Sequence, residues 1–161
     1  MEQAKFNQLK RGERGAILSI VAYMFLSILK LFIGFLSGSE ALKADAFNNI
    51  TDIVASVAVL IGLRLAQKPA DSDHHYGHWK SETIASMIAS FIMMTVGLQV
   101  FMEALKHTVS GVHETPDMLA FYVALVSAIA MFFVYLYNKR LGKAINSQAV
   151  SAAAKDNLSD A

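Results

Sequence analysis

The sequence contains no cysteine, and this absence excludes disulfide bonds, thiolate metal sites and cysteine nucleophiles. Proline is also rare, with 2 residues in a chain of 161. Charged residues make up only 17% of the chain, whereas a soluble domain carries roughly a quarter. The composition therefore argues against an ordinary soluble domain.

Hydrophobic residues are abundant: they form 55% of the chain, and the mean hydropathy is +0.42. They occur in long blocks, four of which are long enough to cross the hydrocarbon core of a bilayer as helices. A fifth helical stretch begins near Ser147 and reaches Ala161. The predicted full spans run from about Gly15 to Leu36, Ala41 to Ala66, Thr83 to Leu105 and Met118 to Tyr137. The sequence thus predicts an all-α, multi-span transmembrane helical bundle with four full spans and a truncated fifth.

Residues 1–14 are polar, and they contain too much acid for a cleaved signal peptide. We expect them to form a cytoplasmic N-terminal arm before a transmembrane domain over residues 15–161. Lysine and arginine gather in alternate connections, whereas the stretches SGSE and HTVSGVHETPD contain neither. The basic clusters are Lys5, Lys10, Arg11 and Arg14; Arg64, Lys68 and Lys80; and Lys139, Arg140 and Lys143. Because cytoplasmic loops carry the positive excess, the N-terminus is predicted to be cytoplasmic.

The stretch DAFNNITD, residues 45–52, places several polar side chains inside the second predicted span. An aspartate at the centre of a membrane helix costs about 2.5–3.5 kcal/mol on insertion. Such residues usually face a bundle interior and mark ion or proton pathways. Asn48 and Asp52 are four positions apart and therefore project from the same helix face. Asp45 lies near this face, toward the outer end of the span, and is a candidate accessory ligand.

The fifth stretch, SQAVSAAAKDNLSDA, repeats this spacing with Asp156 and Asp160. Two helices that each present such a pair can meet around one cation, and oxygen donors in a low-dielectric interior suit a hard divalent ion. Two other interpretations remain open: these polar side chains hydrogen-bond the helices together, or Asp156 and Asp160 lie in water. Lys30, in the first span, is expected to pair with an acid or to extend outward rather than to bind metal.

The connection DSDHHYGHWKSE carries a second cluster, formed by Asp71, His74 and His78. One carboxylate and two imidazoles are a suitable set for zinc or another transition metal. His74 and His78 are expected to share a face only if this segment is helical, and Gly77 argues against a helix. The alternative is a hydrated cytoplasmic loop with incidental histidines.

Three stretches together resemble the signatures of a known family. SEALKADAFNNITD, PADSDHHYGHWKSE and SQAVSAAAKDNLSD look like those of the cation diffusion facilitators, in order and at family spacing. The resemblance covers nearly the whole chain. It implies six transmembrane helices, a cytoplasmic C-terminal domain, and a homodimer that exports divalent metal in exchange for protons. On this basis the chain is expected to be an N-terminal fragment, with an incomplete transmembrane domain and without the C-terminal domain.

The resemblance also implies a metal-site assignment. The transport site would consist of Asn48, Asp52, Asp156 and Asp160, and the loop site of Asp71, His74 and His78. Zinc-transporting relatives usually have histidine at the position of Asp156 and often at that of Asn48. The Asn-Asp-Asp-Asp set is instead similar to the manganese-exporting branch of bacteria, and manganese gains little from nitrogen ligands. Burial disfavours a charged carboxylate and a dication favours it, which is a physical basis for exchanging protons against metal.

We therefore expect a multi-pass protein of the cell membrane that exports a divalent cation, with Mn²⁺ favoured, by antiport with protons. Its expected partners are the metal ion, protons, the lipid bilayer and, for the full-length protein, a second copy. No prosthetic group, nucleic-acid partner or enzymatic activity is expected. The alternatives are a zinc or iron(II) exporter of the same family, a membrane-embedded di-metal enzyme and a structural bundle subunit. A di-metal carboxylate bundle needs Glu-x-x-His pairs, and the sequence contains none.

Overall fold

The computed structural model describes residues 2–75, 77–110 and 118–161. Within these ranges all regular structure is α-helical, which confirms the predicted all-α class. The helices are α1 (Glu2–Ser37), α2 (Glu40–Ala66), α3 (Ser81–Ser110), α4 (Met118–Ile145) and α5 (Gln148–Ser159). Helices α1 to α4 are each long and apolar enough to cross a membrane. The four predicted spans therefore correspond to four helices, and the fifth stretch is the short helix α5.

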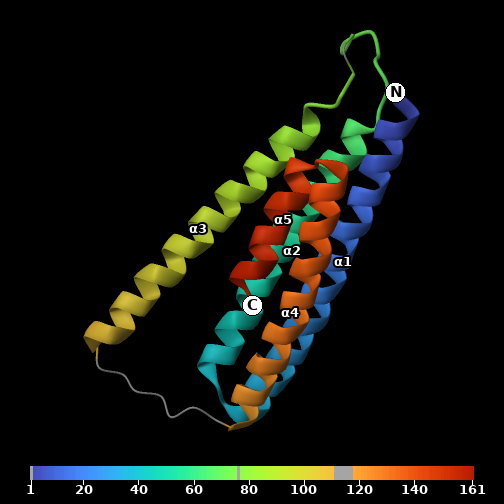
Figure 1. Ribbon diagram of the computed structural model, residues 1–161. Coiled ribbons are helices and arrows are strands. Elements are labelled where there is room, and N and C mark those ends of the chain that lie inside the picture. Colours follow the sequence, from blue (N-terminus) through green and yellow to red (C-terminus); the bar gives the residue numbers. More distant parts are fainter. Residues whose placement is uncertain (1, 76, 111–117) are drawn as a thin grey trace.

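Successive helices run in opposite directions through the bundle (Figure 1). The N-terminus, the loop between α2 and α3, and the turn between α4 and α5 lie at one end. The turn between α1 and α2 lies at the other end, together with the last residues of α3 and the first of α4. Most of the predicted outer loop, residues 111–117, lies outside the described residues.

The predicted N-terminal arm is not separate from the first span, because α1 is continuous from Glu2 to Ser37. The side chain of Glu13 ties this part of α1 to the end of α2. It accepts hydrogen bonds from Gln67 Nε2 and from Arg64 Nε, the latter at 3.5 Å. The predicted start of the span, near Gly15, marks where the apolar run begins, whereas the helix itself begins earlier.

Two turns in the chain have clear local causes. After α1, Gly38 adopts a positive φ of 69°, and the hydroxyl of Ser39 then caps α2 by accepting the backbone N–H of Leu42 at 3.3 Å. After α4, Asn146 adopts a φ of 51°, and Ser147 caps α5 by accepting the N–H of Val150 at 3.1 Å. The second turn reverses the chain within two residues and sends α5 back into the bundle.

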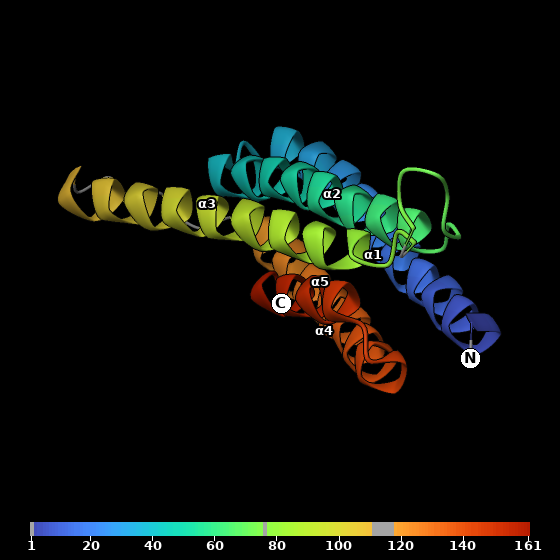
Figure 2. The same cartoon turned by 90° about the horizontal axis from the view of Figure 1, so that it is seen from above.

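Helix α5 is the central element of the packing, since it contacts α1, α2, α3 and α4. Figure 2 shows α1 packed beside α2, and α5 beside α4, with α3 crossing both pairs. The far end of α3 lies away from the other helices in both views. An apolar cluster that includes Leu9, Leu63, Ile145 and Val150 fills the interior near the N-terminal end. A smaller cluster of Tyr23, Leu26 and Met131 joins α1 to α4 further along.

Large apolar side chains cover the outward faces of the long helices. They include Val21, Phe25 and Phe32 on α1 and Phe133 on α4, all of which are exposed. An apolar surface of this extent suits contact with lipid rather than with water.

Candidate metal-binding sites

Three carboxylates from two helices meet inside the bundle. Asp52 comes from α2 and Asp156 from α5, and Asp160 is the capping residue directly after α5. One carboxylate oxygen from each residue lies within 4.8 Å of the others. Asp52 and Asp156 are buried and Asp160 is half-buried. These positions contradict the interpretation in which Asp156 and Asp160 lie in water.

The position of α5 is what makes this meeting possible. Its start is fixed by the cap at Ser147, and its first turns pack closely on α4. A Cβ atom placed on Gly142 would lie 2.8 Å from Ser151 Oγ and 3.1 Å from its backbone nitrogen. Gly142 therefore lets α5 approach α4, and the helix runs inward until its last turn presents Asp156 and Asp160.

One oxygen of this group has no partner of its own. Asp52 Oδ2 is buried and lacks a hydrogen bond from any described residue. A buried carboxylate oxygen without a donor is costly. A cation between the three carboxylates would provide the missing interaction, so the donor set fits a divalent ion held by oxygen ligands.

Asn48 and Asp45 lie on α2 beside this group but have other surroundings. Asn48 is half-buried and lines a groove of about 800 Å³ between α2 and α3, together with Asp45, Thr51 and Gln99. Asp45 pairs with the buried Lys30 of α1, at 2.8 Å between Oδ2 and Nζ. Lys30 thus pairs with an acid, one of the two outcomes expected for it. The adjacent Asn49 is more deeply buried than Asn48, with 1% of its surface exposed.

The structure adds a residue that the sequence analysis missed. Tyr23 of α1 is fully buried, and its hydroxyl donates to Asp156 Oδ2 at 3.2 Å and contacts Asp160 Oδ2. Its oxygen accepts a hydrogen bond from Asn157 Nδ2 at 3.0 Å. The sequence carries a weak signal for this side chain, because a buried tyrosine usually needs a partner for its hydroxyl.

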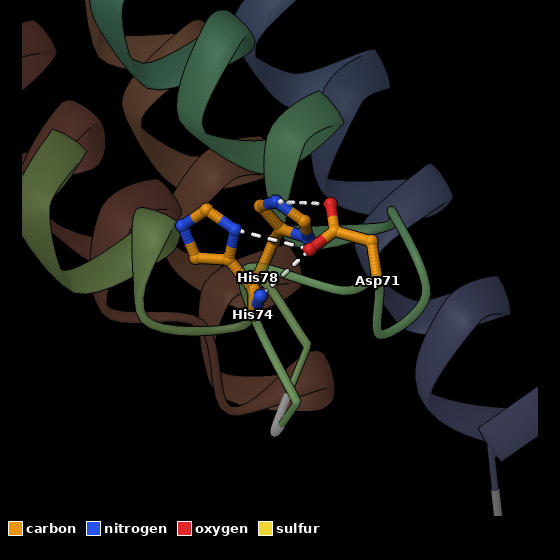
Figure 3. Close-up of side chains that lie close together, drawn as sticks. All are labelled: Asp71, His74 and His78. Carbon is orange, nitrogen blue, oxygen red and sulfur yellow. Dashed lines mark hydrogen bonds and ion pairs between the residues drawn. The ribbon is translucent and has the colours of Figure 1, made fainter.

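The loop between α2 and α3 brings Asp71, His74 and His78 together (Figure 3). One ligand atom from each lies within 4.8 Å of the others. His74 Nδ1 lies 3.2 Å from Asp71 Oδ1, and His78 Nε2 lies 3.5 Å from Asp71 Oδ2. The Nδ1 atom of His78 lies 3.2 Å from the carbonyl oxygen of Pro69. A proton on that nitrogen would leave Nε2 as the ligand atom that faces the cluster.

A turn, and not a helix, produces this arrangement, so the expectation that the two histidines share a face only in a helix was wrong. Gly77 has a φ of 76° and donates its N–H to the carbonyl of His74 at 2.9 Å. The backbone N–H of His74 donates to Asp71 Oδ1 at 2.7 Å. The reversal at Gly77 places the two imidazole ring centroids 4.3 Å apart.

The same hydrogen bonds favour the ionised form of Asp71. Loss of water contact raises the pKa of this carboxyl, but hydrogen bonds from His74 and Asp73 and the proximity of His78 outweigh it. The pKa of Asp71 therefore lies below its usual range. At neutral pH the loop presents a carboxylate beside two imidazoles.

The sequence from residue 16 to residue 161 matches the family model of the cation efflux transmembrane domain. The chain belongs to the cation efflux family. Family membership and the four apolar helices together identify a multi-pass membrane protein. The resemblance to the cation diffusion facilitators, and to their manganese-efflux branch, is confirmed.

Similar proteins from Bacillus subtilis (strain 168) support this placement within the cation efflux family. The manganese efflux system protein MneS is 60% identical over 157 residues, which cover 98% of this chain and 54% of MneS. The uncharacterized transporter YdbO is 59% identical, over 95% of this chain and 53% of its own. The manganese efflux system protein MneP is 36% identical, over 90% of this chain and 48% of its own. The chain thus spans about half the length of these curated relatives.

Proposed function

We propose that this chain forms the membrane part of an exporter that moves divalent metal, chiefly Mn²⁺, out of the cell in exchange for protons. The observation that carries the proposal is the group formed by Asp52, Asp156 and Asp160, whose ligand oxygens lie within 4.8 Å in the bundle interior. We infer that this group binds the transported ion, and we infer no catalytic activity.

The charge of the group supports metal–proton exchange. Three carboxylates this close together, two of them buried, repel one another when all are ionised. Either a dication or protons relieve the repulsion, so the two kinds of cation compete for the same oxygens. Metal binding then expels protons, and metal release allows the carboxylates to take protons up again.

The chemistry of the ligands favours manganese. The interior group provides oxygen atoms from aspartate and no imidazole. Asn48, one helical turn from Asp52, would add a carboxamide oxygen. Zinc and other later metals gain more from nitrogen ligands than manganese does. The relatives MneS and MneP, described as manganese efflux system proteins, lend weight to this choice of ion.

We assign the loop group of Asp71, His74 and His78 a secondary role in metal binding. Its two imidazoles favour metals later in the affinity order than manganese. The group is also largely exposed, and it lies at the end of the bundle that carries the N-terminus. Weak capture of metal at this entrance is consistent with both features.

We also propose how the protein is oriented in the membrane and that it pairs with a second copy. The end of the bundle with the N-terminus carries the clusters Lys10, Arg11 and Arg14, then Arg64, Lys68 and Lys80, then Lys139, Arg140 and Lys143. At the opposite end, Lys43 and Lys106 are single residues. Because cytoplasmic loops carry the positive excess, this distribution supports a cytoplasmic N-terminus. As members of the cation diffusion facilitator family work as homodimers, the full-length protein is inferred to pair with a second copy.

Flux through reconstituted full-length protein tests the function. Proteoliposomes would be loaded with a metal-sensitive dye and presented with Mn²⁺, Zn²⁺ and Fe²⁺ in parallel, with and without a pH gradient. We expect Mn²⁺ flux that depends on the gradient and that Asp52→Asn abolishes. Faster transport of Zn²⁺ or Fe²⁺ than of Mn²⁺ would assign the protein to the alternative exporters. Absence of flux for all three ions would contradict the proposal.

A further inference from the structure

A hydrogen-bonded chain of buried side chains ends at the carboxylates of α5. Tyr23 of α1 is the last member before the acids: its hydroxyl donates to Asp156 Oδ2 at 3.2 Å and contacts Asp160 Oδ2. Asn157 lies behind Tyr23 and donates to the phenol oxygen at 3.0 Å. Neither Tyr23 nor Asn157 has any exposed surface.

Two further residues fix the orientation of Asn157. Its carbonyl oxygen accepts hydrogen bonds from Ser19 Oγ at 3.1 Å and from Asn138 Nδ2 at 2.8 Å. Asn138 Nδ2 also donates to Ser19 Oγ at 2.8 Å. Because two donors use the oxygen of the Asn157 amide, its nitrogen must face Tyr23. The phenol oxygen therefore receives an N–H, and its own proton is directed at the carboxylates.

This arrangement leaves room for a cation. A carboxylate has two oxygens with about four lone-pair positions, so one position can accept a hydroxyl while the others face a metal. Hydrogen bonds of this kind fix the orientation of carboxylates that bind metal. Without a donor between them, Asp156 and Asp160 would repel each other and turn apart.

We propose that Tyr23 is a positioning residue of the metal site, which holds the carboxylates of Asp156 and Asp160 toward the ion and is itself oriented by Asn157. The inference rests on the proposed function, since it concerns the same interior group. It gives α1 a part in the site in addition to α2 and α5.

The direct test is Tyr23→Phe in the purified full-length protein, with Mn²⁺ affinity measured by isothermal titration calorimetry. The ring, and with it the packing against Leu26 and Met131, is preserved. We expect Mn²⁺ to bind about 10- to 100-fold more weakly, the usual effect of losing a partner of a metal ligand. Tyr122→Phe removes an exposed hydroxyl from α4 and is the matched control, with unchanged affinity.

A double-variant comparison of Tyr23 and Asn157 separates a positioning role of Tyr23 from a general effect on packing. Asn157→Ala should weaken Mn²⁺ binding as well, because it releases the hydroxyl of Tyr23. The double variant should lose little more than Tyr23→Phe alone, since the two residues act along one path. Ser19→Ala, two hydrogen bonds from Tyr23, should give a smaller loss in the same direction.

The outcomes distinguish this inference from the function on which it rests. Unchanged or tighter binding in Tyr23→Phe overturns the positioning role, and so do losses that simply add in the double variant. If wild type and Asp52→Asn both fail to bind Mn²⁺, the proposed function fails, and the inference fails with it.

Discussion

We propose that the choice of metal ion depends on Asp156 more directly than on any other single side chain of the interior group. Asp156 is buried, belongs to the interior group and accepts the hydroxyl of Tyr23. A histidine there would replace an anionic oxygen ligand with a neutral nitrogen ligand. Zinc gains from that nitrogen, whereas manganese loses an oxygen and gains little.

We therefore predict that Asp156→His in the full-length protein shifts the site toward zinc. A change in discrimination of about 1.4 kcal/mol is tenfold in relative affinity, and replacing one ligand is expected to produce at least that. Competitive flux or binding of Mn²⁺ against Zn²⁺ measures it, with Glu40→His at the exposed start of α2 as the control. An unchanged ratio in a folded protein would show that selectivity is determined outside this group.

Some residues of the interior group and its surroundings could be predicted from the sequence, and others could not. Asp52, Asp156 and Asp160 could be identified because acids in apolar segments are rare and because the last two are spaced by one helical turn. Tyr23 could not be identified in this way, because a tyrosine is ordinary in an apolar span. Its partner Asp156 is also 133 positions away in the sequence. On α2, Asn49 is buried more deeply than its neighbour Asn48, a difference that the spacing alone could not show.

Among the helices, α2 and α3 approach each other closely at one glycine, Gly62. A Cβ atom on Gly62 would lie 2.1 Å from Ala85 Cβ and 2.9 Å from the carbonyl oxygen of Ser81. Both atoms belong to or adjoin the backbone of α3, so neither can move without moving that helix. The small residue at this position therefore determines how closely α3 approaches the bundle.

Gly62→Ala should consequently lower the thermal unfolding temperature of the protein in detergent. Alanine is favoured over glycine within a helix by up to about 1 kcal/mol, but the clash with α3 outweighs that gain. Gly97→Ala is the matched control, because a Cβ atom at Gly97 meets nothing within 4 Å. That control should be neutral or slightly stabilising. If both variants behave alike, close packing at Gly62 does not hold α3 in place.

The metal-binding group in the loop between α2 and α3 can be compared with the interior group by substitution. We predict that Asp71→Ala, His74→Ala and His78→Ala each reduce Mn²⁺ transport less than Asp52→Ala or Asp160→Ala. The loop ligands are mostly exposed and rich in imidazole, whereas the interior group is mostly buried and offers only carboxylate oxygens. Flux assays of the five variants measure the ranking, with His75→Ala as the control from the same exposed loop. Equal losses at the two sites would contradict it.

The helix ends were harder to predict than the helices. Hydropathy placed the start of the first span at Gly15 and the end of the fourth at Tyr137, whereas α1 begins at Glu2 and α4 ends at Ile145. Apolar runs report the part of a helix that lies in lipid, and backbone hydrogen bonding continues beyond it. The start of α5 was predicted closely: the sequence placed it near Ser147, and the structure shows Ser147 as the N-terminal cap of this helix.

Across the whole molecule, the interior carboxylates separate two unlike regions of the bundle. Toward the end with the N-terminus, α2 contributes Val59 and Leu63 to the apolar cluster. Toward the opposite end, α2 contributes Asp45 and Asn48 to the groove beside α3. On the proposed cytoplasmic side of the carboxylates, α2 therefore contributes to close apolar packing, and on the other side it borders a groove of mixed lining.

The orientation behind that statement can be tested by cysteine labelling of the full-length protein. Residues 1–161 contain no cysteine, so only positions beyond them need to be cleared of native thiols. Ser72→Cys places a thiol in the exposed loop between α2 and α3, and Thr108→Cys places one near the far end of α3. With the N-terminus in the cytoplasm, a membrane-impermeant maleimide applied to intact cells should label Thr108→Cys. It should label Ser72→Cys only after permeabilisation, and the cysteine-free parent should stay unlabelled throughout. The reverse pattern would place the basic clusters outside, which would contradict the positive excess of cytoplasmic loops and reverse the proposed direction of export.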